Sequence, residues 1–196
     1  MRIIYCILFL FVVIPTMAQT SYKDSLNLYL ENYVAKHEVV KGKDKEHLSF
    51  YDVDGQYRVM ANFTATENSP WFEMPTSGKM KKLFRIYGVV KFKIGNANLQ
   101  LNLYKSQSLM QDPAYADYLF LPFTDATSGI ESYAGGRYID LKTSDIIDGK
   151  IVIDFNKAYN PYCAYVLGVY NCPIPPKENN LNVAIRAGEK DFAKTK

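Results

Sequence analysis

The sequence predicts a mainly β protein, a single antiparallel β-sandwich or barrel-like domain with one N-terminal amphipathic helix after a signal peptide. The composition favours a sheet, because 16 Tyr and 11 Phe occur among 196 residues together with 11 Gly and 9 Pro, a combination typical of strands and turns. From Leu48 onward, several segments alternate apolar and polar residues with the period of a strand. No repeat or linker divides the chain, so we expect one domain.

The overall composition excludes several classes of protein. Hydrophobic residues make up 48% of the chain and charged residues 22%, which excludes a disordered chain, a collagen-like repeat and a coiled coil. The formal net charge of +3 is too small to indicate a nucleic-acid partner. We therefore expect a folded domain that does not bind nucleic acid.

Residues 1–18 have the pattern of a secretory signal peptide. A positive start at Arg2 precedes an apolar run of about 12 residues, which is too short for a bilayer-spanning helix of ~20 residues. Pro15 ends that run, and small side chains precede Gln19. The pattern favours a cleaved signal over a membrane anchor. We expect an exported chain, periplasmic or extracellular, with no stable membrane span after cleavage.

Residues 19–47 are predicted to form a helix and a charged loop. Ser21 and Asp24 have the spacing of a capping box at the start of a helix. The apolar positions that follow share one helical face, namely Leu26, Leu30, Tyr33 and Val34. Lys41–Glu46 is then predicted to be a solvated loop.

Residues 48–196 form the predicted β domain, and its strongest element is a hairpin. Alternating runs at 84–94 and 97–104 are joined by Gly95-Asn96, a turn signal, and Gly88 indicates a bulge or a close backbone approach. Asp148-Gly149 indicates another turn. The remaining predicted strands are Tyr57–Thr64, Tyr118–Leu121, Arg137–Leu141, Ile151–Phe155 and Leu181–Arg186.

The C-terminal third contains four blocks rich in polar and aromatic residues: PFTDATSGIESYAGGRY, DFNKAYNPYCAY, CPIPPKENNL and AIRAGE. These blocks closely resemble the signature blocks of the domain-of-unknown-function family 1684, over roughly Leu48 to Glu189. The resemblance implies one domain with these blocks as its common feature, and it implies no reaction.

The blocks favour binding of a small polar ligand or a glycan. Tyrosine rings beside amide and carboxylate groups suit a flat, hydroxylated molecule, and functional residues are often carried on loops. The alternative is that the tyrosines pack in the core. The candidate ligand-binding residues are Asp125, Thr127, Glu131, Tyr133, Arg137, Asn156, Tyr159, Asn160 and Asn179.

A hydrolase is an alternative, because paired carboxylates can act as acid and base on a glycosidic bond. The catalytic candidates are Asp125, Glu131 and Asp154, although the sequence does not give their separation. The competing interpretation is structural, with Asp125 and Thr127 bonding turn backbone and Arg137 forming an ion pair. A third alternative is a structural envelope protein without a small ligand. The sequence does not decide whether the chain is an enzyme, or its oligomeric state.

Cys163 and Cys172 are the even pair that remains once Cys6 leaves with the signal peptide. In an oxidising compartment, such a pair predicts a disulfide; free buried thiols are the next alternative and a metal site the last. We expect no metal and no cofactor, since His37 and His47 are the chain's two histidines and lie far from the cysteines in sequence.

A basic cluster lies on and before the predicted hairpin, with Lys79, Lys81, Lys82, Arg85, Lys91 and Lys93 as its members. Lysines commonly protect the solvated face or edge of a strand from aggregation, and a polyanion site is the alternative.

Overall fold

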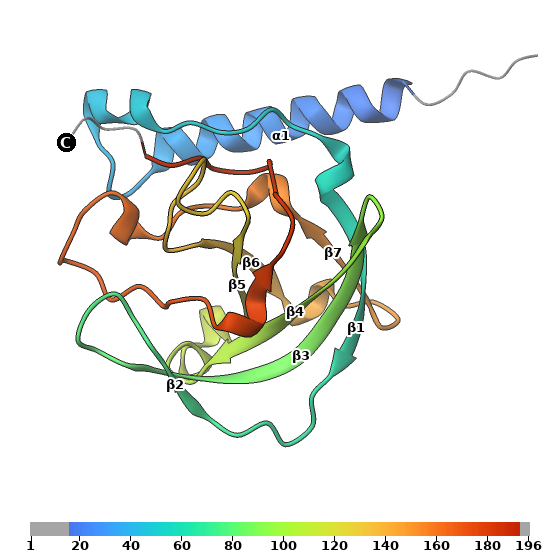
Figure 1. Ribbon diagram of the computed structural model, residues 1–196, viewed down its shortest axis with the longest axis vertical. Helices are drawn as coiled ribbons and strands as arrows, with labels where there is room; N and C mark the ends of the chain where they lie inside the picture. Colours follow the sequence, from blue (N-terminus) through green and yellow to red (C-terminus); the bar gives the residue numbers. More distant parts are fainter. Residues whose placement is uncertain (1–15, 193–196) are drawn as a thin grey trace, which may run out of the picture.

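The computed structural model describes residues 16–192 of the chain. The predicted signal peptide lies outside the described residues except for its last three positions. Helix α1 (Thr16–Lys36) comes first and lies along one side of a curled sheet (Figure 1). Within residues 16–192, no helix is long and apolar enough to cross a membrane.

The described strands form one mainly antiparallel sheet with the order β6-β5-β4-β3-β1-β7. A short β2 pairs with β3, and β8 adds a parallel pair to β5. The strands are β1 (Arg58–Ala65), β2 (Phe72–Met74), β3 (Lys82–Ile94), β4 (Ala97–Ser106), β5 (Tyr118–Asp125), β6 (Arg137–Lys142), β7 (Lys150–Asp154) and β8 (Asn180–Leu181).

The sheet curls into a half-barrel, so the mainly β prediction is confirmed and the barrel-like alternative describes it better than the sandwich. The two outer strands of the order, β6 and β7, are brought together by the segment after β7. Tyr159 in that segment forms an isolated bridge with Tyr138 of β6, with N–H to oxygen distances of 2.9 and 3.0 Å. This bridge covers part of an edge that would otherwise expose unpaired backbone groups.

The hairpin β3–β4 is confirmed, with Gly95 at a positive φ of 55° in its turn. The bulge predicted at Gly88 is also present, because the pairing with β4 shifts between Ile86 and Gly88. A side chain at this position would lie 2.3 Å from the ring of Phe63. Glycine therefore allows two strands to approach closely.

Strand alternation gives the sheet two apolar faces. The main core lies inside the curl and includes Leu119, Leu121 and Phe123 of β5 with Ile139 and Leu141 of β6. The intervening residues form a second, aromatic cluster on the opposite face, which contains Met74, Phe84, Tyr104, Phe120 and Tyr138. Alternate side chains of β5 and β6 therefore enter two different clusters, the main core on one face and the aromatic cluster on the other.

Three predicted elements require correction. Helix α1 begins at Thr16, so Ser21 lies inside it and is not its N-cap, since the helix-forming residues at 17–19 extend it. The loop expected at Lys41–Glu46 is mostly a 3₁₀-helix, Gly42–His47. The strand predicted at Leu181–Arg186 is reduced to the two residues of β8. The backbone of Ile185 bonds instead with the side chains of Arg137 and Asp125.

Short 3₁₀-helices connect the strands. Besides Gly42–His47, they span Gly55–Tyr57, Leu109–Gln111, Pro113–Tyr115, Thr143–Asp145, Phe155–Lys157, Tyr162–Ala164 and Lys177–Asn179. Leu26 of helix α1 is buried, and the Tyr22 hydroxyl attaches the helix to the sheet by donating to Asp154 at the end of β7. The helix therefore has a fixed position beside the segments that follow β7.

Candidate functional site

Asp125 and Arg137 form an ion pair inside the protein, and neither side chain is exposed. Asp125 ends β5 and Arg137 begins β6, and the Arg137 Nη2 lies 3.1 Å from the Asp125 Oδ1. Gly136 makes the entry to β6 possible, since its φ is 84° and a side chain there would lie 2.6 Å from the Phe123 carbonyl oxygen. The predicted tight turn is therefore present, and it directs Arg137 into the core.

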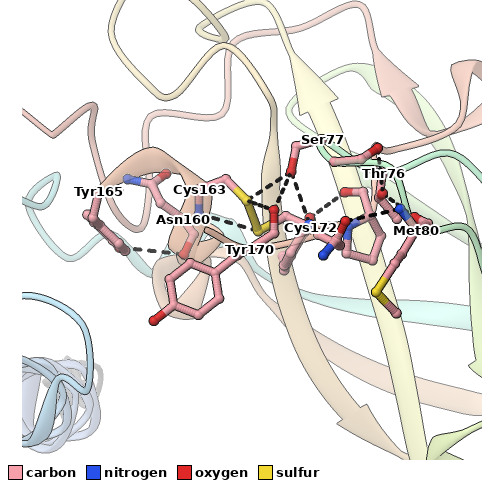
Figure 2. The surroundings of a disulfide bond; sticks show 12 residues. Thr76, Ser77, Met80, Asn160, Cys163, Tyr165, Tyr170 and Cys172 are labelled. Carbon is pink, nitrogen blue, oxygen red and sulfur yellow. Dashed lines mark hydrogen bonds between the residues drawn. A yellow bond between two sulfur atoms is a disulfide. The ribbon is translucent and has the colours of Figure 1, made fainter. Parts of the chain in front are cut away.

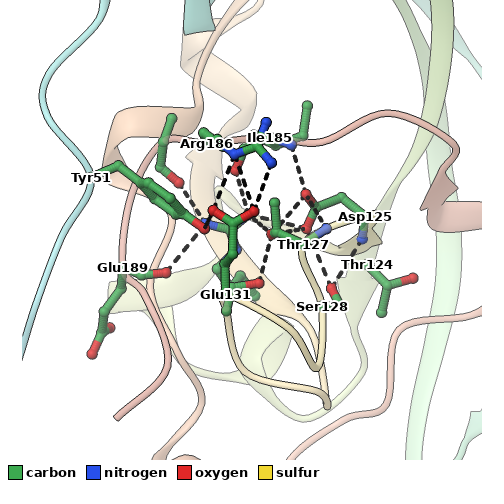
Figure 3. A network of polar contacts seen from close by, with 12 residues as sticks. Tyr51, Thr124, Asp125, Thr127, Ser128, Glu131, Ile185, Arg186 and Glu189 are labelled. Carbon is green, nitrogen blue, oxygen red and sulfur yellow. Dashed lines mark hydrogen bonds and ion pairs between the residues drawn. The ribbon is translucent and has the colours of Figure 1, made fainter. Parts of the chain in front are cut away.

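Further hydrogen bonds join the pair to the C-terminal segment and to the turn after β5. The Arg137 guanidinium donates to the carbonyl oxygens of Ile185 at 2.9 Å and Glu189 at 3.2 Å, and also to that of Ala187. Asp125 accepts from the Ile185 backbone N–H at 2.7 Å and from the Thr127 hydroxyl (Figure 3). Because the pair is buried and bound to protein groups, Asp125, Thr127 and Arg137 hold the fold together rather than facing a ligand.

Glu131 occupies a more open place on the same side of the protein. Arg186 contacts it with an Nη2–Oε1 distance of 2.7 Å, and the Tyr51 hydroxyl lies 3.4 Å from its Oε2 (Figure 3). The hydrogen bonds from Arg186 hold the pKa of Glu131 below its usual value. Glu131 is thus kept ionised in an ion pair.

Asp154 and Asn156 attach helix α1 and the segment before β1 to the end of β7. Asp154 accepts the Tyr22 hydroxyl at 2.9 Å and the Asn156 amide at 3.0 Å. The Asn156 side chain also bonds both backbone groups of Asp54, at 3.0 and 2.9 Å. All three catalytic candidates, Asp125, Glu131 and Asp154, are therefore engaged in bonds with other parts of the protein.

Asn179 replaces missing sheet bonds between β4 and β5, which pair only at Tyr104 and Phe120. Its amide nitrogen donates to the carbonyl oxygens of Asn102 at 2.9 Å and Pro122 at 2.7 Å, and its oxygen accepts from the Asn102 N–H. An amide side chain matches both backbone groups of a strand. Asn179 is therefore a structural clamp.

Glu189 is a fully buried carboxylate that joins three segments. Its Oε1 accepts the Tyr165 hydroxyl at 2.7 Å, and its Oε2 accepts the Asn160 N–H at 2.9 Å and the Tyr33 hydroxyl of α1 at 3.2 Å. Burial raises the pKa of Glu189 to about 7, although these hydrogen bonds lower it in part. Asn160 is buried in the same place, and the half-buried Tyr133 packs beside Gly135.

The structure joins Cys163 and Cys172 in the predicted disulfide (Figure 2), with the two Cα atoms 6.3 Å apart. Ser77 lies against it, accepting the Cys172 N–H at 3.1 Å, and the Asn171 Oδ1 accepts the Met80 N–H. The disulfide and these bonds fix the position of residues 170–173, which line the pocket described next.

A pocket of about 840 Å³ lies on the aromatic face of β5 and β6, opposite the main core. Helix α1 and the segments 159–162 and 170–173 complete its wall. The pocket is lined by eight of the chain's 16 tyrosines: Tyr29, Tyr33, Tyr115, Tyr118, Tyr138, Tyr159, Tyr162 and Tyr170. Tyr159 contacts both Tyr138, at 5.9 Å between ring centroids, and Tyr33, at 6.4 Å, so rings from strand, loop and helix form a connected wall. We call this the tyrosine pocket.

Asp140 of β6 is the acidic group of the tyrosine pocket that the sheet supplies. The hydroxyls of Tyr118 and Tyr159 both donate to its Oδ1, each at 2.7 Å. Its Oδ2 accepts no hydrogen bond from residues 16–192, and the side chain is open to the pocket. Desolvation by the surrounding protein raises the pKa of Asp140, and the hydrogen bonds from the two tyrosine hydroxyls lower it in part. The two tyrosine hydroxyls therefore fix the position of one carboxylate oxygen of Asp140.

The nine predicted ligand-binding residues therefore do not converge on one cavity. Tyr159 lines the tyrosine pocket, whereas Asp125, Thr127, Arg137, Asn156, Asn160 and Asn179 are buried in structural contacts and Glu131 and Tyr133 lie elsewhere. Asp140 is not among the site residues that the sequence predicts. The available signal is strand alternation, which places Asp140 on the same face as Tyr138. A second signal is the four-residue spacing of Tyr29 and Tyr33 in α1, continued by His37 just after the helix.

The protein is mainly β and is built on an antiparallel half-barrel with the tyrosine pocket on one face of its sheet. The chain belongs to the family described as protein of unknown function (DUF1684), whose model matches residues 43–190. This confirms the resemblance seen in the four sequence blocks.

A solved structure has a similar fold. It is the solution NMR structure of an uncharacterized protein of Haloarcula marismortui, with a TM-score of 0.66 and 28% sequence identity, covering 91% of this chain and 98% of that chain. No curated protein matches the chain. These comparisons establish the family and the fold and name no ligand.

The first prediction concerns the buried ion pair. Arg137→Met should lower the free energy of unfolding by about 3–5 kcal/mol, because it leaves Asp125 buried without its counter-ion and several carbonyls without donors. Urea unfolding followed by circular dichroism measures this loss. Arg186→Met is the matched control, since it breaks the exposed ion pair with Glu131 and should cost much less. Equal losses would contradict a structural role for Arg137.

The second prediction concerns Glu189. In the unfolded chain its pKa returns to the ordinary value near 4.5, whereas the folded value is about 7, so the folded state binds the proton more tightly. Its contribution to stability is complete below pH 4.5 and is lost as the pH rises to about 7, a loss on the order of 3 kcal/mol. Glu189→Gln keeps the shape and removes this titration. The difference in unfolding free energy between the two proteins should therefore change across this interval, and a constant difference from pH 4.5 to 7.5 would refute the assignment.

Proposed function

We propose that this chain is an exported binding protein that holds a small polar ligand, specifically a glycan, in the tyrosine pocket. The observation that carries the proposal is Asp140, whose Oδ1 is fixed by two tyrosine hydroxyls while its Oδ2 is open to the pocket. A free carboxylate oxygen accepts hydrogen bonds from sugar hydroxyls.

The walls of the pocket support a glycan rather than a purely apolar ligand. Tyrosine rings offer apolar faces to the C–H groups of a sugar ring, and their hydroxyls offer hydrogen bonds. The amides of Asn32 and Asn171 also line the pocket. Its volume of about 840 Å³ falls within the range of small-molecule sites.

Export is supported by the N-terminal signal pattern and by the Cys163–Cys172 disulfide, since disulfides persist mainly in oxidising compartments. The hydrolase alternative gains no support from Asp125, Glu131 and Asp154, because each is bound by other groups of the protein and none lines the tyrosine pocket.

The proposal is tested by measuring saccharide binding to the mature protein with a thermal-shift screen followed by calorimetry. Asp140→Asn should weaken binding about ten-fold or more, because Tyr118 and Tyr159 keep the amide oxygen in place and turn the NH₂ toward the ligand. Glu131→Gln is the control, since it changes a carboxylate outside the pocket and should leave affinity unchanged. Absence of binding to every saccharide, or equal effects of the two substitutions, would contradict the proposal.

A further inference from the structure

Lys82 brings an unpaired positive charge to the tyrosine pocket. It is the first residue of β3 and lies on the same face as Phe84, which places its half-buried side chain in the pocket wall. Its ammonium makes no hydrogen bond or ion pair with any residue in the described range 16–192. Burial lowers the pKa of Lys82, so the charged form is held there at a cost. An anionic ligand group would offset that cost.

His37 contributes a second unmatched donor. His37 lines the pocket, and the residue is 5% exposed. The Nδ1 accepts the backbone N–H groups of Val39 and Val40, at 3.3 and 2.9 Å, so the proton of the neutral ring lies on Nε2. Within the part of the chain that the structure describes, this Nε2–H has no partner. A buried donor without an acceptor is unfavourable, and a ligand oxygen would satisfy it.

The two acidic residues of the pocket, Glu38 and Asp140, each accept tyrosine hydroxyls on one carboxylate oxygen. Tyr162 donates its hydroxyl to Glu38 at 2.7 Å, and Asp140 accepts two hydroxyls on one oxygen. Beside the free oxygen of Asp140, the pocket therefore offers the donor of His37 and the cations of Lys82 and Lys36. A complementary ligand must supply acceptors and a negative charge.

We propose that the glycan held in the tyrosine pocket is an acidic one, whose carboxylate pairs with Lys82 while its hydroxyls face Asp140. This inference rests on the proposed function and adds the substrate class. Repulsion by Asp140 directs the carboxylate toward Lys82, and the His37 Nε2–H donates to another oxygen of the same ligand. Lys82 thus determines the specificity for acidic over neutral saccharides.

A glycan array with matched pairs tests the proposal. Each uronate-containing glycan is paired with its methyl ester, which has the same ring geometry and lacks the charge. The unmodified mature protein should bind the acid members at least ten-fold more strongly than the esters. Lys82→Met, which keeps the chain length, should reduce binding of the acids to the level of the esters. Lys79→Met removes the same charge from an exposed position outside the pocket and should preserve the preference.

The array separates the two proposals. If esters and acids bind equally, or if Lys82→Met retains the preference for acids, the acidic-ligand inference is overturned while the glycan pocket stands. If no saccharide on the array is bound, both proposals are overturned. Circular dichroism checks the fold of Lys82→Met, and with an intact fold a lost preference reports on the pocket and not on stability.

Discussion

The burial of one guanidinium organises the C-terminal third of this protein. A charged group removed from water must be matched by an opposite charge and by hydrogen-bond acceptors, or the fold loses several kcal/mol. Asp125 supplies the charge for Arg137, and the carbonyls of residues 185–189 supply acceptors. Those residues therefore follow a path set by a side chain rather than by strand pairing, and they bring Glu189 to the place where it meets Tyr33 of α1.

The amide side chains of Asn179 and Asn156 likewise match buried polar groups with hydrogen-bond partners. Asn179 bridges β4 and β5 where their own pairing stops, and Asn156 holds the segment before β1 against the end of β7. Polar residues in loops that appeared to be ligand groups instead satisfy backbone groups that irregular structure leaves unpaired. This scaffold, together with the disulfide, fixes the helix and loops that form the wall of the tyrosine pocket.

Local patterns in the sequence were sufficient for much of the fold. The hairpin at Gly95 and the bulge at Gly88 are encoded by neighbouring residues, and the even number of cysteines after the signal pattern predicts the disulfide. The path of residues 181–186 could not be predicted in this way. It is set by the hydrogen bond from Arg137 to the Ile185 carbonyl oxygen, and Arg137 lies 48 positions earlier in the chain. The curl of the sheet depends on the pairing of distant strands, so local patterns do not distinguish a sandwich from a barrel.

The candidate site was harder to predict for a related reason. The sequence blocks are dense in polar residues, and density alone does not separate groups that bind the backbone from groups that face a cavity. Alternation along β6 makes that distinction: Arg137 faces the core with Ile139, whereas Asp140 faces the tyrosine pocket with Tyr138. One strand thus contributes to the buried ion pair on one face and to the wall of the tyrosine pocket on the other.

That division is the central claim, and an NMR titration tests it most directly. When an acidic oligosaccharide is added to the ¹⁵N-labelled mature protein, we expect the largest amide shifts at Tyr118, Asp140 and Tyr159, with little change at Ile185 and Ala187. Shifts centred on Ile185, Ala187 and Arg137, with none at Asp140, would show that the ligand binds the buried network and would contradict the account.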